Sequence, residues 1–514
     1  MSSPQSSPSP RPELRGLALP QAEWRRTVRR RVRAGQRLAG LYGTDARGAC
    51  QLTALVTGGD RIDVLSTLVE PDADGTIRYP ALSGDVPAAF WYERALHDLS
   101  GVVPQGHPRL DPLLLDRGGE APAPLPGAPA LPAPGPAVGE RQGPVDVAGH
   151  GMFTLPLGPV RSGVLESIEF LIETPGEDIP HLNVRPHYKH RGIAKQFEGR
   201  TPHDAVLVAE RVEGISSVAH ALAFCHAVEA LGEITVGPDA RLVRVALAEL
   251  ERIANHLDVT MRLADAAGLA VAASRFGWHK ERVLRLMSGL CGNRFGRGLV
   301  VPGGLARGLE VDGPGLAAEL ARLGRLVRGD VAALEASASF LDRLRTTGPL
   351  PAEIALRHGA LGPIGRASGV DNDVRRERPY DGYLDLDPMP RPAAAVTGQG
   401  DALARTRVRW QEVESSVVLA GHALDRLGER TVVGVEAGLT DGLPDGLGVG
   451  SAESAQGEVV HAVELVGGVV RRCFARSASF HNLVLFHDVF VGDVFTDLPF
   501  IEASFGLGYA GVAM

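Results

Sequence analysis

The chain has 514 residues, of which 44% are hydrophobic, and a formal net charge of −8 at pH 7. This length is sufficient for two or three domains around a sizeable buried core. The acidic balance argues against a general nucleic-acid-binding surface, although arginines cluster between residues 25 and 33. The four cysteines form no C-x-x-C pair, which favours a reduced, cytoplasmic setting. No apolar run reaches the about 18 residues of a membrane-spanning helix, so we expect any membrane link to pass through a partner.

The first third of the chain predicts a leader and a small α/β domain. Residues 1–15 are rich in Ser, Pro and Arg, a composition typical of a disordered leader. From there to residue 116, short apolar runs separated by Gly, Asp and Pro predict strands at 51–59 and 61–70. The segment 90–101 has helical apolar spacing. We therefore predict a domain over residues 16–116.

A segment dense in Pro, Ala and Gly, residues 117–147, cannot pack a core and predicts an extended linker. The remainder, 148–514, predicts a mostly helical domain with minor β-sheets, because alternation typical of a strand at 166–174 gives way to long helical periodicities. Residues 457–476 predict a hairpin that turns at Gly467 and Gly468. The predicted fold class is therefore α+β. Helices are predicted over residues 204–231, 241–266, 270–292, 314–345 and 401–428.

One string in the small domain carries a specific pattern, FWYERALHDLSGVVPQGHPRL at residues 90–110. It resembles the signature of the small peripheral-arm subunit of complex I, E-x-x-x-x-D-hydrophobic-aromatic-G followed by G-H-P-x-L. Glu93, Asp98 and His107 fall in register with this signature, whereas Ser100 stands where the family has an aromatic residue.

The rest of the chain, from about residue 148 to the last residue, resembles the large subunit shared by complex I and the membrane-bound nickel-iron hydrogenases. The fusion of both parts in one chain is similar to formate-hydrogenlyase-type hydrogenases. The matching strings are GHGMFTLPLGP, YKHRGIAKQFEGR, ERVEGISSVAHALAFCHAVE, LAELERIANHL, GPIGRASGVDNDVR and ARSASFHNLVLFHDVFVGDVFTDLPFIEAS.

The resemblance implies four cysteine ligands for nickel and iron in two C-x-x-C pairs, because thiolates are soft ligands that suit these metals. This sequence has neither pair. The string RVEGISSVAH places Glu213 and Ser216 at the first two ligand positions, and FGLGYAGVAM places Gly508 and Gly511 at the second two. Gln456, in SAQGE, replaces an arginine of the hydrogenase pattern. We therefore expect no nickel-iron site of the family type.

The resemblance to complex I implies a histidine and a tyrosine that hold a quinone head group. Arg161 occupies the histidine position and Gly214 the tyrosine position. Glu166 aligns with a magnesium-binding glutamate of the hydrogenases, so magnesium is expected there. Glu213 and His220 are the candidate catalytic residues, for proton transfer, because a buried carboxyl group often has a raised pKa. The remaining residues expected to line the cleft are Arg161, Gly214, Arg366, Asp371, Asp373 and Gln456.

The resemblance implies a large subunit of a membrane-associated complex I-like or hydrogenase-like oxidoreductase complex, acting as an electron relay or scaffold. Expected partners are an iron-sulfur small subunit, which holds the cluster, and membrane subunits that keep the chain at the inner face of the cell membrane. One alternative is a subunit that reduces a quinone or another small acceptor, as in NADH-quinone oxidoreductases. Another is a free-standing binding protein. No glycine-rich dinucleotide fingerprint follows a strand, so the sequence does not favour direct NADH binding.

Overall fold

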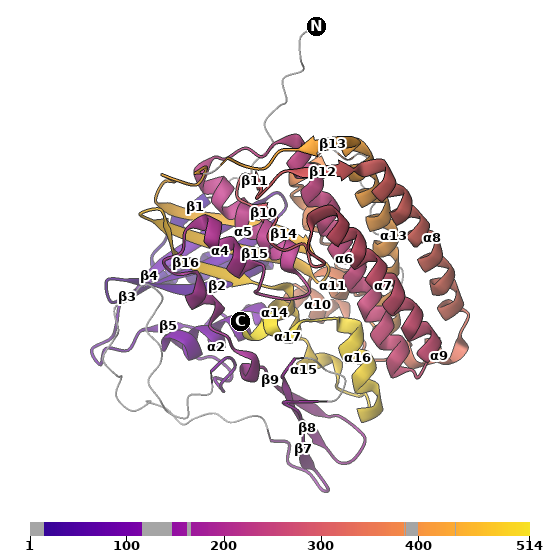
Figure 1. Ribbon diagram of the computed structural model, residues 1–514. Helices are drawn as coiled ribbons and strands as arrows, with labels where there is room; N and C mark the ends of the chain where they lie inside the picture. Colours follow the sequence, from indigo (N-terminus) through magenta and orange to yellow (C-terminus); the bar gives the residue numbers. More distant parts are fainter. Residues whose placement is uncertain (1–14, 116–145, 162–165, 385, 387–398, 437) are drawn as a thin grey trace.

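The computed structural model describes residues 15–115, 146–161, 166–384, 386, 399–436 and 438–514. Nearly all of the predicted leader and linker lies outside these residues. Long helices gather on one side of the molecule and small β-sheets on the other (Figure 1). The fold is therefore α+β, as the sequence predicts.

A four-stranded sheet with the order β1-β4-β3-β2 forms the N-terminal unit. Helix α1 packs mainly on β4 and helix α2 on β2, and the parallel pair β5 and β6 lies beside them. The strands predicted at 51–59 and 61–70 and the helix predicted at 90–101 are confirmed. The elements are β1 (Arg15–Ala18), α1 (Gln21–Arg33), β2 (Arg37–Ala46), β3 (Ala49–Gly58), β4 (Arg61–Val69), β5 (Arg78–Pro80), α2 (Phe90–Ser100) and β6 (Val103–Gln105).

The signature residues of α2 hold the loops of this unit in place. Glu93 is fully buried and accepts a hydrogen bond of 2.6 Å from the backbone amide of Leu82. Asp98 accepts bonds of 2.6 and 2.8 Å from the amides of Leu113 and Leu114. A buried carboxylate that receives backbone N–H groups fixes the path of the chain, because leaving those amides unpaired would be costly.

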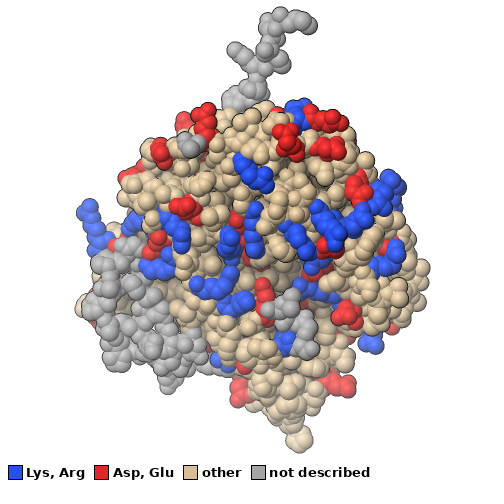
Figure 2. Space-filling model, viewed as in Figure 1, with Lys and Arg blue, Asp and Glu red and all other residues tan. Residues whose placement is uncertain are grey.

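Several arginines of the cluster on α1 have acidic partners within the unit. Arg25 and Arg29 form ion pairs of 3.0 and 2.8 Å with Asp85, and Arg31 pairs with Asp63. Figure 2 shows that basic and acidic side chains are interspersed on the visible face of the molecule. These ion pairs hold part of the cluster against the N-terminal unit.

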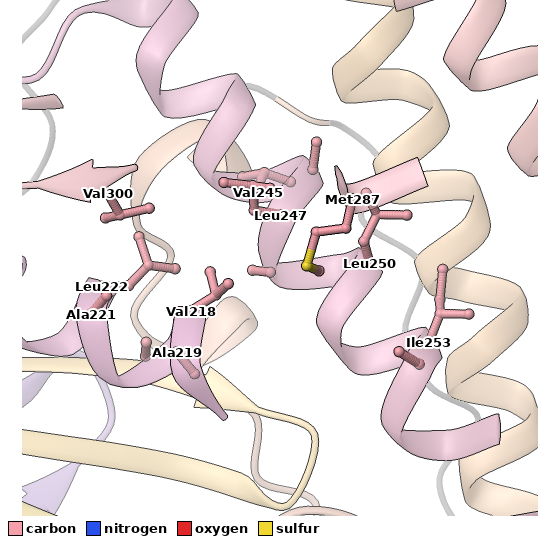
Figure 3. Packing of buried hydrophobic residues seen from close by; sticks show 14 of the residues in the cluster. Val218, Ala219, Ala221, Leu222, Val245, Leu247, Leu250, Ile253, Met287 and Val300 are labelled. Carbon is pink, nitrogen blue, oxygen red and sulfur yellow. The ribbon is translucent and has the colours of Figure 1, made fainter. Parts of the chain in front are cut away.

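Four long helices build the core of the large unit. Helix α6 (Pro238–Ala266) packs along both α7 (Ala270–Cys291) and α13 (Ala402–Leu427), and α8 (Gly313–Glu335) packs on α13 and α7. Buried side chains from neighbouring helices meet in this core, among them Val218, Val245 and Met287 (Figure 3). The regularly spaced apolar residues that predict these helices form one stripe along each helix, and that stripe is the buried side.

A three-stranded antiparallel sheet, β14 (Gly446–Ser454), β15 (Gly457–Val466) and β16 (Val469–Arg476), joins the two units. Helix α5 (Ser217–Gly232) packs on β14 and β15, and side chains of this sheet share an apolar cluster with the N-terminal sheet. The predicted hairpin over 457–476, with its turn at two glycines of positive φ, is confirmed.

The C-terminal elements pack against a second three-stranded sheet, β7-β8-β9, and the N-terminal unit. Strand β8 confirms the strand predicted near 166–174. These and the remaining elements are β7 (Phe153–Leu157), β8 (Glu169–Thr174), β9 (His181–Arg185), α3 (Ile193–Phe197), β10 (Val300–Val301), β11 (Gly304–Leu305), β12 (Leu309–Asp312), α10 (Ala352–His358), α11 (Gly362–Ala367), α12 (Val374–Glu377), β13 (Glu429–Val432), α14 (Ala478–Leu483), α15 (Phe486–Val489), α16 (Leu498–Phe505) and α17 (Tyr509–Ala513).

Two of the predicted helices are wrong as continuous elements. The run 204–231 is divided into α4 (Pro202–Ala209) and α5 by a loop over 210–216, because Glu213 and Ser216 turn inward to polar partners from distant segments. The run 314–345 is divided into α8 and α9 (Ala338–Leu344). The predictions for 241–266, 270–292 and 401–428 are confirmed by α6, α7 and α13.

Among the helices of the described residues, none combines the length and the apolar character that crossing a bilayer requires.

The packing of α5 on β14 leads to a stability prediction. A Cβ atom at Gly450 would lie 2.2 Å from the carbonyl oxygen of Ala223, so Gly450→Ala must push α5 off the sheet. We expect this variant to lose about 1–3 kcal/mol or more in free energy of unfolding, measured by urea denaturation. Gly289→Ala on α7 is the control, since its Cβ meets nothing within 4 Å, and it should gain about 0.5–1 kcal/mol. An unchanged stability of Gly450→Ala would contradict this packing.

Candidate functional site

Four segments that are far apart in the sequence meet at the candidate site. They are the loop 210–216, the β14–β15 turn that carries Gln456, the start of α14 and the segment 506–511. Each contributes buried polar groups or backbone. The structure therefore brings together the predicted ligand positions Glu213, Ser216, Gly508 and Gly511 and the predicted cleft residue Gln456.

The Glu213 side chain lies at the centre of the site, with no exposed surface. Ser479 donates a hydrogen bond from Oγ to Glu213 Oε1 and accepts one of 3.0 Å from the backbone amide of Gly508. Burial raises the pKa of Glu213 to about 7, although the hydrogen bond from Ser479 opposes this effect. Glu213 can therefore exchange a proton near neutral pH.

Glycine at 508 and 511 is a packing requirement of the Glu213 carboxyl group. A Cβ atom at Gly508 would lie 2.6 Å from Glu213 Oε1, and one at Gly511 would lie 2.7 Å from Glu213 Cδ. Real Cβ contacts are essentially never this short, so the Glu213 carboxyl group would have to move if a side chain stood at either position. The carboxyl group fills space that the second pair of ligands would need.

The donor set at these four positions does not fit a nickel-iron centre of the family type. Such a centre needs soft thiolates that converge on the metals. This chain offers one carboxyl group and one hydroxyl group at the four positions, and the two glycines offer no ligand atom. The hydroxyl group of Ser216 is also engaged, since it donates a bond of 2.9 Å to Gln456 Oε1. Among the residues that the structure describes, no group of three or more His, Cys, Asp and Glu side chains is arranged to hold a metal ion.

A row of buried titratable groups leads away from Glu213. His220 Nε2 lies 3.9 Å from Glu213 Oε2, and neither atom has a hydrogen-bond partner within the described part of the chain. His220 Nδ1 lies 2.9 Å from His461 Nε2, and His461 Nδ1 lies 3.5 Å from Cys473 Sγ. Burial lowers the pKa of His220 to about 3 and that of His461 well below its usual range. Both imidazoles are therefore neutral at pH 7.

A second cluster contains Arg161, which the resemblance to complex I predicts at a quinone position. Arg161 donates two hydrogen bonds, of 3.0 and 2.6 Å, to the two carboxylate oxygens of Glu502, and its guanidinium lies 4.9 Å from the centre of the Phe170 ring. Tyr509 donates its hydroxyl hydrogen to the same carboxylate. Gly214 lies in an exposed turn and offers no side chain. Tyr509 therefore supplies a phenol beside Arg161 although the tyrosine position of the family holds Gly214.

Glu166 and Arg191 hold the C-terminal helix against the site. Glu166 Oε2 accepts a bond of 2.8 Å from the amide of Ala510, and Arg191 donates bonds of 2.6 and 2.8 Å to the carbonyl oxygens of Val212 and Ala510. The structure thus gives Glu166 a backbone partner, and magnesium at this position stays a prediction.

The other predicted cleft residues belong to a separate network of buried charges. Arg366 pairs with Glu412 at 2.6 Å and with Glu453 at 3.1 Å. Asp373 pairs with Arg375 at 2.7 Å, which helps to hold the pKa of Asp373 below its usual range. Asp371 is half exposed and pairs with Arg376 outside this network. None of these three residues contacts Glu213 in the hydrogen bonds and ion pairs of the described residues, so the structure does not place Asp371, Asp373 and Arg366 with the Glu213 site.

Sequence reasoning did not single out four residues that shape the site, His461, Ser479, Glu502 and Tyr509. Three of them lie in strings that carry the resemblance or the degenerate ligand pattern, ARSASF, FIEAS and FGLGYAGVAM. The local sequence pattern does not distinguish these residues from other residues of a strand or a short helix. Their place in these strings was therefore the signal that could have identified the three of them as site residues.

A small N-terminal unit fused to a helical large unit is the arrangement of a large-subunit protein of the complex I and hydrogenase type. The sequence matches three family descriptions. They are "Respiratory-chain NADH dehydrogenase, 30 Kd subunit" over residues 23–127, "Nickel-dependent hydrogenase" over 191–260 and "Respiratory-chain NADH dehydrogenase, 49 Kd subunit" over 270–441.

Curated relatives confirm this assignment. The chain is 30% identical to the membrane-bound hydrogenase subunit alpha of Pyrococcus furiosus over 68% of its own length and 84% of that protein. It is 28% identical to formate hydrogenlyase subunit 5 of Escherichia coli over 86% of its own length and 77% of that protein. The chain belongs to the family of large subunits of complex I-like and hydrogenase-like membrane complexes.

One solved structure shows the same fold. A chain of the membrane-bound sulfane sulfur reductase, an archaeal respiratory membrane complex, superposes with a TM-score of 0.64 at 22% identity, covering 72% of this chain and all of that one.

The buried Glu213 leads to a pH-dependent stability prediction. Its pKa is raised from 4.5 to about 7, so the unfolded chain releases this proton first, and the folded state loses stability as pH rises from about 4.5 to 7. Glu213→Gln removes this loss. Between pH 5 and pH 8 the free energy of unfolding of the variant should rise relative to that of the wild type by up to about 3 kcal/mol.

Urea denaturation at the two pH values measures this difference. Glu429→Gln is the control, because Glu429 is exposed and its neutralisation should leave the pH dependence unchanged. An equal pH dependence in the wild type and Glu213→Gln would show that Glu213 is not the buried titrating group.

Proposed function

We propose that this chain is the large subunit of a membrane-associated complex I-like or hydrogenase-like oxidoreductase complex, and that it works without nickel as an electron-relay or scaffolding subunit. One observation carries the proposal. The Glu213 carboxyl group fills the space against Gly508 and Gly511 where the second pair of thiolate ligands would stand. A scaffold that keeps its packing after its ligands are replaced still offers its surfaces to partner subunits.

The family assignment supports the partners in this proposal. The relatives are named as subunits of a membrane-bound hydrogenase and of formate hydrogenlyase. We therefore propose an iron-sulfur small subunit and membrane subunits as partners, with this chain peripheral on the inner face of the cell membrane. The solved neighbour belongs to a complex titled for sulfane sulfur reduction, so the fold also occurs in a complex that is not titled a hydrogenase.

Elemental analysis of the complex, purified with its native partners, tests the proposal. We expect no stoichiometric nickel per large subunit, and no iron beyond that of the partner clusters, because the four positions supply no thiolate. The separately purified iron-sulfur partner is the control for cluster iron. One nickel per large subunit would contradict the proposal and would require ligands outside the family pattern.

A second function is favoured by the cluster of Arg161, Glu502 and Tyr509. The Nε atom of Arg161 is buried and has no hydrogen-bond partner among the described residues, so it keeps an N–H donor that suits the oxygen of a quinone or another small acceptor. In this alternative, two electrons come from a cluster of the partner, and two protons complete the reduction of a quinone to a quinol. Glu213, with its pKa of about 7, would supply protons, whereas His220, with its pKa of about 3, is neutral at pH 7 and can only relay them.

Turnover of the intact complex with a soluble quinone distinguishes the two functions. If the chain reduces the acceptor, Arg161→Leu should raise KM, since it removes the unpaired donor, and Glu213→Gln should lower kcat about 100-fold or more, since it removes the proton source. Ser100→Ala, in the N-terminal unit, is the control. If both site variants leave turnover unchanged, the acceptor function is excluded and the relay or scaffolding function stands.

A further inference from the structure

A cavity of about 270 Å³ lies where the N-terminal unit meets the large unit. Strand β2 and helix α2 form one side, and strand β16, helix α3 and the last residue, Met514, form the other. The size is close to the lower end of the range for small-molecule pockets, about 300–1,000 Å³. The cavity is separate from the Glu213 site, and no function assigned above uses it.

The walls of this cavity are mostly apolar. Leu41 and Leu96 line it from the N-terminal unit, and Ile193 and Phe474 line it from the large unit. Phe474 stacks on Tyr42 with ring centres 4.6 Å apart, which makes one aromatic wall. A ligand body that matches these walls is apolar, since a polar one would lose its hydration without replacement.

One cation in the cavity lining lacks acceptors. The Nε and Nη1 atoms of Arg472 are buried and have no hydrogen-bond partner among the residues that the structure describes. The guanidinium lies 5.2 Å from the centre of the Tyr42 ring. Burial lowers the pKa of Arg472, although nearby ionisable groups oppose this effect. A buried guanidinium with unpaired N–H groups is costly, so an acceptor is expected there.

Two other cations around the cavity already have partners. Lys195 pairs with Glu198 at 2.7 Å, and Arg476 pairs with Glu458 at 2.8 Å, whereas the Oε1 atom of Glu198 is buried without a partner among the described residues. The two unpaired N–H groups of Arg472 suit a carboxylate, whose oxygens accept charge-assisted hydrogen bonds. A phosphate group would bring more charge than this one cation balances.

We propose that this cavity binds a small apolar carboxylate, a short acyl chain or an aromatic acid. Its carboxylate accepts hydrogen bonds from Arg472, and its apolar body packs against Leu96 and Phe474. Because the cavity walls come from both units, the bound ligand fastens the N-terminal unit to the large unit. This proposal does not depend on the function of the Glu213 site.

Isothermal titration calorimetry of the purified full-length chain tests the proposal with decanoate as the probe and decanol as the uncharged control. We expect decanoate to bind with one site per chain and decanol to bind about tenfold more weakly or worse, because it lacks the charge-assisted bonds. Arg472→Gln should weaken decanoate binding by a similar factor. Leu96→Trp, which fills the cavity, should abolish binding of both molecules.

Arg471→Gln is the matched control. Arg471 is the neighbour of Arg472 and already pairs with Glu464 at 2.6 Å, so decanoate binding should be unchanged. Far-ultraviolet circular dichroism and the unfolding midpoint verify that each variant is folded. Absence of saturable decanoate binding, or equal binding by the wild type and Arg472→Gln, would overturn the proposal and leave the cavity to a segment of the chain or to a partner subunit.

Discussion

The contact of the Glu213 carboxyl group with the backbone of Gly508 and Gly511 determines what the rest of the site can be. A Cβ atom at either position would overlap the carboxyl group where it now lies, so the two glycines leave the space that it occupies. Glu213 and the two glycines therefore share one small space between the loop before α5 and α17. Ser479 completes the arrangement, since its hydroxyl group donates to Glu213 and accepts from the Gly508 amide. The result is a hydrogen-bonded pocket around a buried carboxyl group.

The same scaffold is held by buried charge elsewhere. Glu412 accepts hydrogen bonds from Arg366 and lies 2.8 Å from His256, and Arg375 joins Glu249 to Asp373. Breaking one partner of such a pair leaves an uncompensated buried charge and typically costs about 3–5 kcal/mol. These pairs link α6, α11, α12 and α13 independently of any metal. The large unit can therefore keep its shape without a metal at the Glu213 site.

Local pattern predicted the long elements because their apolar stripes are regular over many turns, as in α13 and in the β15–β16 hairpin. It failed at 204–231, where the apolar spacing continues through 210–216 while the chain breaks to bury Glu213. The reason for that break lies in Ser479 and Gly508, far along the sequence. The resemblance located the ligand positions, and the structure brings all four together. The resemblance could not predict that Tyr509 lies beside Arg161, because this contact forms only when α17 packs against the segment that carries Arg161.

The most direct test of this account is X-ray diffraction from crystals of the native complex, with anomalous data collected at the nickel absorption edge. The account predicts electron density for the Glu213 carboxyl group in contact with Ser479 Oγ and the two glycines, with no anomalous peak between the loop before α5 and α17. An anomalous nickel peak at that place, with Glu213 displaced from the glycines, would contradict it.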